Sequence, residues 1–153
     1  MRAQIISGFP GVGKTHMAKQ LGNTILKISD SDSSGFSWCA PGVRDPNFPC
    51  NYIKHIASIM NLYDLIFVSS HKVVRDALID NNIPFLLVYP DKKLKSEYLH
   101  RYNNRGSDIE FVKMMDKNWD KFITEIEEIN DELVTKIKLS KDESIGRVIH
   151  DFI

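Results

Sequence analysis

A glycine-rich segment near the N-terminus constrains the fold of this chain more than any other feature. Gly8–Thr15 read Gly-Phe-Pro-Gly-Val-Gly-Lys-Thr, and they directly follow the apolar run 3–7. Glycines let a backbone curl with its N–H groups pointing inward, a shape that other residues resist. A helix expected over 14–21 would direct its positive N-terminal end at an anion in that curl. The pattern predicts a phosphate-binding loop after a first strand.

The polar residues of this loop have predicted roles in binding a nucleotide. Lys14 places a positive charge beside the terminal phosphates, and Thr15 offers a hydroxyl to Mg²⁺. The alternative is a structural glycine-rich turn. The predicted nucleotide contacts are Gly8, Gly11, Val12, Gly13, Lys14, Thr15 and His16.

Length and composition predict one domain over residues 1–153. Lys plus Arg and Asp plus Glu number 20 each, so no global field draws the chain to nucleic acid or a membrane, although a local basic groove is compatible with this balance. No apolar run approaches membrane-spanning length, and the N-terminus lacks the pattern of a signal peptide. Cys39 and Cys50 match no zinc or redox spacing. We expect a cytoplasmic protein with reduced thiols, no membrane contact and no obligate protein partner.

Strand and helix signals alternate along the chain, which predicts an α/β fold. Apolar runs predict strands over 24–29, 64–69, 84–89 and 133–139, and helices are expected over 51–61, 72–81, 94–104, 108–128 and 145–152. Segment 33–50, rich in Gly, Pro, Ser and aromatics, is predicted to be a long functional loop. The apolar seam of helix 108–128 suits a coiled-coil partner or the domain's own sheet, and we favour the sheet. Together these signals predict a three-layer P-loop fold with a five-stranded parallel sheet.

Ligands of such sheets gather where the strands end. Asp30-Ser31-Asp32 ends the second strand. One interpretation is an ordinary Asp- and Ser-rich turn. In the functional interpretation, Asp30 joins Thr15 in holding Mg²⁺, and Asp32 accepts the proton of an attacking hydroxyl. A carboxylate base is useful only for an alcohol acceptor, because a phosphate oxygen is already ionised.

Three motifs resemble the small P-loop kinases. They are the phosphate loop, the Asp-x-Asp after the second strand, and Ser-Ser-His-Lys-Val-Val-Arg-Asp-Ala-Leu over 69–78. Shikimate and gluconate kinases have a similar Asp-x-Asp, and gluconate kinases also have a similar Ser-x-x-Lys followed by Arg-Asp-x-Leu. Adenylate-kinase-like enzymes share the loop and an arginine-bearing lid. The resemblance implies a phosphotransferase using ATP and Mg²⁺, with a short helical lid over about 92–107 and acceptor contacts at Ser69, His71 and Arg75.

Basic residues crowd the expected lid. Lys92, Lys93, Lys95, His100, Arg101 and Arg105 stand against the single acid Glu97. Arg101 and Arg105 are spaced i, i+4 and share one face of a helix. The helix is either solvated, or its two arginines are catalytic residues that close over ATP and neutralise charge on the transferred phosphoryl group. We favour the second, because the pair lies where the resemblance places a lid.

The acceptor is expected to bind segment 33–52. Aromatic rings with one arginine suit a flat heterocycle carrying a phosphate, although rings such as Phe36 and Phe48 also suit a core. With the residues named above, the predicted acceptor contacts are Asp32, Phe36, Trp38, Arg44, Tyr52, Ser69, His71 and Arg75.

One further resemblance concerns the acceptor. Asp-Ser-Asp-Ser-Ser over 30–34, with Phe36-Ser37-Trp38, looks like small phage-encoded kinases that phosphorylate the hydroxymethyl group of hydroxymethyluracil in DNA. A basic lid beside an aromatic loop suits a flipped-out base with flanking phosphates, and zero net charge is the feature that fits least. We therefore expect a DNA-modification kinase acting on a modified pyrimidine, in DNA or as a nucleotide. The alternatives are a nucleoside monophosphate kinase, a gluconate-type metabolite kinase, or a non-catalytic ATP-binding module.

Overall fold

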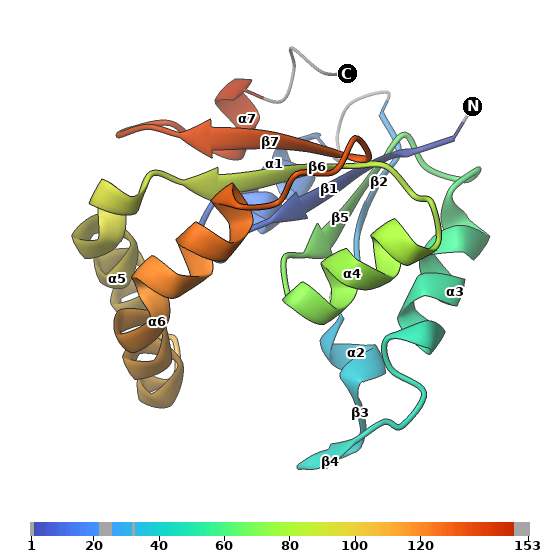
Figure 1. Cartoon of the computed structure of the whole chain (residues 1–153), viewed down its shortest axis with the longest axis horizontal. Coiled ribbons are helices and arrows are strands. Elements are labelled where there is room, and N and C mark those ends of the chain that lie inside the picture. Colours follow the sequence, from blue (N-terminus) through green and yellow to red (C-terminus); the bar gives the residue numbers. More distant parts are fainter. Residues whose placement is uncertain (1, 22–25, 32, 149–153) are drawn as a thin grey trace.

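A five-stranded parallel sheet forms the centre of the computed structural model, which describes residues 2–21, 26–31 and 33–148. The strand order is β2-β5-β1-β6-β7, and every neighbouring pair is parallel (Figure 1). The strands are β1 (Gln4–Gly8), β2 (Ile28–Asp30), β5 (Leu65–Ser69), β6 (Phe85–Pro90) and β7 (Val134–Leu139). The predicted α/β class and five-stranded parallel sheet are confirmed.

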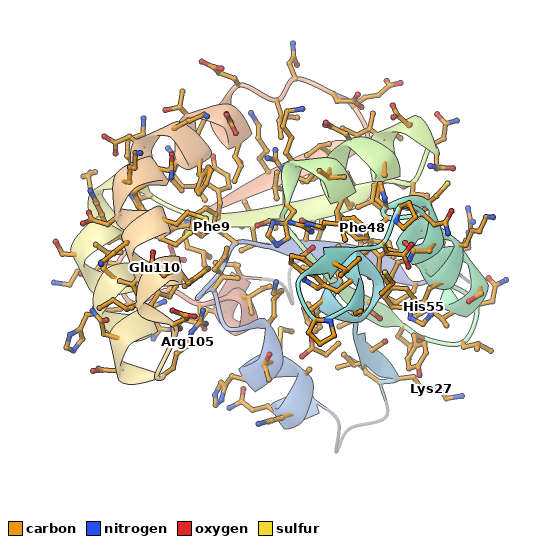
Figure 2. All side chains as sticks on the ribbon, turned by 90° about the horizontal axis from the view of Figure 1, so that it is seen from below. Phe9, Lys27, Phe48, His55, Arg105 and Glu110 are labelled. Atoms are coloured by element: carbon orange, nitrogen blue, oxygen red, sulfur yellow. The ribbon has the colours of Figure 1, made fainter. Side chains whose placement is uncertain are left out.

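Helices cover both faces of this sheet. Figures 1 and 2 show α4 (Lys72–Asp80) and α6 (Ile109–Glu127) on one face, and α1 (Lys14–Leu21) and α7 (Ile145–Val148) on the other. The remaining helical elements are α2 (Ser34–Ser37), α3 (Cys50–Ile59), the 3₁₀ turn η1 (Lys92–Leu94) and α5 (Lys95–Asn104). Residues 149–152 of the expected last helix, and 24–25 of the expected second strand, lie outside the described residues.

The central strand β1 places the glycine-rich loop in the middle of one sheet edge. Gly8 is the register partner of Ser69 on β5 and of Val88 on β6. The side chains of β5 and β6 are almost all buried, as expected for parallel strands covered on both faces. The carboxyl ends of β1, β5 and β6 therefore meet where the loop begins.

Helix α6 packs on its own domain, as predicted. Met115, Trp119 and Ile126 of its seam are buried, and Val112, Phe122 and Ile129 are partly buried against the same core. The Trp119 ring meets Phe9 edge-on with 5.4 Å between centroids, and its Nε1 donates to the Lys92 carbonyl at 2.8 Å. The Asp108 side chain caps the helix by accepting from the backbone of Glu110. Most of the seam thus packs against the chain's own core.

Segment 33–50 contains more regular structure than the predicted loop. It includes α2 and an antiparallel hairpin of β3 (Trp38–Ala40) and β4 (Val43–Arg44). The turn between them has Pro41 followed by Gly42 with a φ of 74°, an order that fits a type II turn. Pro41 and Gly42 therefore mark a tight turn between two strands.

Candidate functional site

The glycine-rich loop is curled, with its carbonyl groups engaged by the protein. Gly11 and Gly13 have φ values of 90° and 99°, which side chains disfavour. The carbonyl oxygens of residues 8 to 13 accept in turn from Lys14 Nζ (2.8 Å), Val12 N (3.2 Å), Tyr102 OH (2.7 Å), Arg101 Nη1 (2.9 Å), Ile145 N (3.0 Å) and Met17 N (2.9 Å). Because these oxygens are bound internally, the loop presents little negative charge to a phosphate. The first N–H groups of α1 have no acceptor within that helix and suit an anion.

Lys14 and the pair Thr15–Asp30 stand directly beside this curl. Lys14 Nζ lies 2.8 Å from the Gly8 carbonyl oxygen and 3.5 Å from that of Val68. The Thr15 hydroxyl donates to Asp30 Oδ2 at 3.1 Å, so the two predicted magnesium ligands are in contact. Residues 2–21, 26–31 and 33–148 contain no group of three or more metal-binding acids, His or Cys. Mg²⁺ here would bind Thr15, Asp30, phosphate oxygens and water, which is its usual coordination beside nucleotides.

Asp32, the predicted proton acceptor, lies outside the described residues. Its neighbour Ser31 is buried, and the Ser31 backbone N–H donates to the Phe67 carbonyl at 3.0 Å. Asp30 is the register partner of Phe67 on β5. The start of the Asp-Ser-Asp run therefore lies at the sheet edge that also holds the glycine-rich loop.

Helix α5 of the expected lid is docked against the loop. Arg101 Nη1 and Tyr102 OH donate to the carbonyls of Gly11 and Pro10, and the rings of Tyr98 and Tyr102 are fully buried. Burial raises the pKa of both tyrosines above the usual range. Arg101 stacks over Tyr98 at 4.4 Å from the ring centroid. This face of α5 is a fixed wall beside the loop.

The sequence analysis did not identify Tyr98 and Tyr102 of α5 as site residues, although their spacing carries a signal. Tyr98 and Tyr102 have the same i, i+4 spacing as Arg101 and Arg105 and precede each arginine by three residues. Each arginine stacks on its tyrosine, since Arg105 lies 5.0 Å from the Tyr102 centroid. The paired spacing of aromatic and cationic residues could have indicated a helix with one buried face and one face toward a ligand.

A cleft of about 1120 Å³ joins these elements and is rich in positive charge. Cationic and acidic side chains of several elements line it: Lys14, Arg44, Lys72, Arg75, Arg101 and Arg105 against Asp30 and Glu125. Among the described residues, the lining therefore contains six Lys or Arg side chains and two carboxylates. The whole chain, by contrast, has 20 Lys plus Arg and 20 Asp plus Glu. The positive charge is therefore concentrated where the glycine-rich loop opens. The cleft is suited to a ligand, or two ligands together, with several negative charges.

The structure brings most of the predicted site residues into this cleft. Gly8, Gly11, Gly13, Lys14, Thr15 and His16 line it, as do Asp30, Arg44, Ser69, His71, Arg75, Arg101 and Arg105. Val12 does not line it, because its side chain is buried in the core.

Three predicted aromatic contacts lie elsewhere. Tyr52 is fully buried, and its hydroxyl donates to the Ser31 carbonyl. Phe36 packs between Tyr52 and His55, with ring centroids 5.4 Å and 4.8 Å away. Trp38 lies on the hairpin, is 42% exposed and does not line the cleft. The Arg44 guanidinium stacks over the Trp38 ring, with Cζ 4.3 Å from the ring centroid. Phe36 and Tyr52 are therefore core residues, and only Arg44 of the predicted acceptor segment reaches the cleft. Figure 2 shows Phe48 and His55 on the α2–α3 side of the molecule, opposite Arg105.

Helix α6 supplies the apolar wall that sequence reasoning assigned to segment 33–52. Its side chains in the cleft are Phe111, Met114, Met115, Phe122 and Ile126. Phe111 and Met114 fall outside the predicted seam, and Met114 remains 42% exposed. The signal was an apolar face wider than packing on a sheet requires. Phenylalanine and methionine side chains suit a flat apolar ligand.

Comparisons with known proteins add little to this picture. No protein-family model matches the chain, and no curated protein matches it. A solved structure titled "uncharacterized protein from Eubacterium ventriosum ATCC 27560" is similar, with 16% sequence identity and a TM-score of 0.48. The match covers 99% of this chain and 96% of that one. In the part of the chain that the structure describes, no helix is both long and apolar enough to cross a bilayer.

Proposed function

We propose that this chain is an ATP-dependent phosphotransferase of the P-loop kinase class. The observation that supports this best is the cleft, in which a curled glycine-rich loop, Lys14 and five further cations meet in a chain without net charge. Phosphoryl transfer depends on positioning and on neutralising charge, so it needs such an environment more than it needs a reactive protein group. A switch GTPase or motor ATPase would be expected to carry an acid where Ser69 ends β5 and Ser70 follows it.

The donor half of the site uses the loop and its neighbours. Lys14 contacts the terminal phosphates, and Arg101 and Arg105 add positive charge from α5. Thr15 and Asp30 would hold Mg²⁺, which neutralises phosphate charge when bound. The contact of Arg101 with the Gly11 carbonyl fixes the distance between α5 and the loop. The arginines therefore act from a preorganised wall, which lowers the cost of aligning them at the moment of transfer.

The acceptor we propose is the hydroxymethyl group of a modified pyrimidine such as hydroxymethyluracil, in DNA or as a nucleotide. The α6 wall of Phe111, Met114 and Phe122 suits a flat base better than a polyol. The acceptor oxygen bonds to the γ-phosphorus of ATP, and the bond from that phosphorus to the bridging oxygen breaks to release ADP. Asp32 takes the hydroxyl proton, the role that its place in the Asp-x-Asp pattern implies.

A nucleoside monophosphate kinase is the second candidate, and the buried cation Arg75 is the observation that favours it. Such an enzyme transfers to a phosphate oxygen and needs no carboxylate base. The two candidates are therefore separated by their dependence on Asp32 and by their products, a phosphorylated base against a nucleoside diphosphate. A gluconate-type kinase and a non-catalytic ATP-binding module have less support, because the cleft has both an apolar wall and a second set of cations.

The test is a labelled-ATP screen over hydroxymethyluracil-containing DNA, nucleotides and polyols, with products separated by chromatography. Label should appear on the modified base. Asp32→Asn should abolish transfer and leave ATP affinity nearly unchanged, while Asp120→Asn, an exposed acid of α6 outside the cleft, should retain activity. Near-normal turnover in Asp32→Asn would remove the general-base role. ATP binding without transfer to any acceptor would contradict the kinase proposal.

A further inference from the structure

Arg75 is a buried cation without an ion-pair partner in the described part of the chain. It lies in the first turn of α4 and is 6% exposed. Its Nε donates to the Ser70 carbonyl at 2.8 Å. The adjacent carboxylate of Asp76 pairs with Lys72 at 2.6 Å instead. None of the salt bridges among residues 2–21, 26–31 and 33–148 includes Arg75.

A charge in this position is costly for the folded chain. Removing a guanidinium from water is unfavourable unless it is paired and hydrogen-bonded. Burial lowers the pKa of Arg75, and the charges of Asp76 and Glu125 oppose that shift. Arginine nevertheless stays protonated at neutral pH. The Ser70 carbonyl supplies only a dipole, and the carboxylates of Asp76 and Glu125 act on Arg75 without forming a salt bridge to it, so no carboxylate among the residues described neutralises the guanidinium by direct contact.

The position of Arg75 links it to the phosphate loop and to α6. Helix α4 follows β5, whose Ser69 is the register partner of Gly8, and Lys14 Nζ lies 3.5 Å from the Val68 carbonyl oxygen. Glu125 of α6 is close enough to influence the pKa of Arg75 without forming a salt bridge. Its helix neighbours Phe122 and Ile126 also line the cleft. Arg75 therefore faces a cavity with an apolar wall opposite and the phosphate loop beside it.

We propose that Arg75 binds a phosphate group carried by the acceptor itself, while the α6 wall covers its base. This inference rests on the proposed function and identifies the acceptor's phosphate as a group that the cleft recognises. The phosphate belongs either to a free nucleoside monophosphate or to the backbone of a DNA strand. A guanidinium fits both, because its planar N–H groups match phosphate oxygens in pairs. An unphosphorylated nucleoside, a polyol or a sugar acid would leave the buried charge without this partner.

Calorimetric titration in the presence of ADP and Mg²⁺ tests the inference. The probes are deoxynucleosides, including hydroxymethyldeoxyuridine, their 5′-monophosphates, and short single strands containing each base. For at least one base, the monophosphate or the strand should bind about 10- to 100-fold more tightly than the nucleoside, the range for a charge-assisted contact. The monophosphate arm identifies a free nucleotide, and preference for the strand alone identifies DNA.

Three variants separate a specific contact from general charge. In Arg75→Met the preference for phosphate should fall to about twofold or less, and Arg75→Lys should keep part of it. The double variant Lys72→Met, Asp76→Asn removes an exposed cation of the cleft without leaving the Asp76 carboxylate free beside Arg75, so it should change the preference by less than about threefold. If Arg75→Met does not fold, Arg75→Lys provides the test: it should lose part of the preference for phosphorylated probes while its ADP affinity stays unchanged.

The inference is overturned if the wild-type protein binds nucleosides and phosphorylated probes equally, or if Arg75→Met keeps the preference. It is also overturned if Arg75→Met and the Lys72→Met, Asp76→Asn double variant reduce the preference equally. These outcomes are distinct from failure of the kinase proposal. Absence of phosphoryl transfer with the phosphate preference intact would refute the kinase and leave the subsite. Transfer to phosphate-free acceptors, unaffected by Arg75→Met, would refute the subsite alone.

Discussion

Substituting alanine for Gly11 tests whether α5 and the phosphate loop form one packed unit. A Cβ at Gly11 would lie 3.0 Å from Tyr102 Cε1 and 3.1 Å from Tyr98 Cδ2. Neither ring can yield easily, because both are fully buried and Tyr102 is held by its bond to the Pro10 carbonyl. The φ of 90° adds backbone strain of about 1–2 kcal/mol, and overpacking adds about 1–3 kcal/mol. We therefore expect Gly11→Ala to lower the free energy of unfolding by about 2–5 kcal/mol.

Gly106→Ala provides the matched control for this prediction. Gly106 also has a positive φ, 76°, but a Cβ there would have no neighbour within 4 Å. It should therefore show only the strain, about 1–2 kcal/mol. Urea denaturation followed by circular dichroism measures both variants, and ATP titration should show weaker binding only for Gly11→Ala. Equal destabilisation of the two variants would refute the docking of the tyrosines on the loop.

Three further predictions concern single side chains. Tyr102→Phe should cost about 1–2 kcal/mol of unfolding free energy, because the Pro10 carbonyl loses its donor. Burial raises the pKa of Tyr102, so the stability of the wild-type protein should be intact below the unfolded pKa of about 10 and should fall as the pH rises above it. Urea midpoints measured across this pH range should show a smaller alkaline loss in the variant than in the wild type. Lys14→Met should weaken ATP binding at least about tenfold by calorimetry with unchanged circular dichroism, and equal affinity would remove Lys14 from the donor site. Trp38→Ala should change the free energy of unfolding by less than about 1 kcal/mol, since the ring is half-exposed. A larger loss, measured by urea denaturation, would show that the Trp38 ring stabilises the fold.

The fold was predictable because its signals are local and repeated. Continuous apolar runs such as 64–69 indicate strands buried on both faces, and the alternation with helices then permits few arrangements other than a parallel sheet. The hairpin at Trp38 was missed because its two short strands carry no periodicity, and only the Pro41–Gly42 turn marks it. The Asp32 interpretation stays a prediction.

The site was less predictable, because an apolar residue does not reveal which neighbour it will meet. Phe36 and Tyr52 were assigned to the ligand from their place in a segment rich in turns, and they pack on one another. Conversely, Met114 on a helix assigned to the core faces the cleft. Charged residues did better, since Arg101 and Arg105 both line the cleft as expected, although they also contact the loop and the tyrosines of α5. The position of cations could therefore be predicted, whereas that of rings depended on the packing.

The carbonyl bonds of the loop have a consequence for the order in which the chain is made. Gly8–Thr15 leave the ribosome early, but Arg101, Tyr102 and Ile145, which hold three of the loop's carbonyls, are synthesised about 90 or more residues later. A nascent chain therefore carries an unsupported loop until α5 and the start of α7 have folded against it. The nucleotide site that we propose should therefore form only after α5 and the start of α7 have been synthesised.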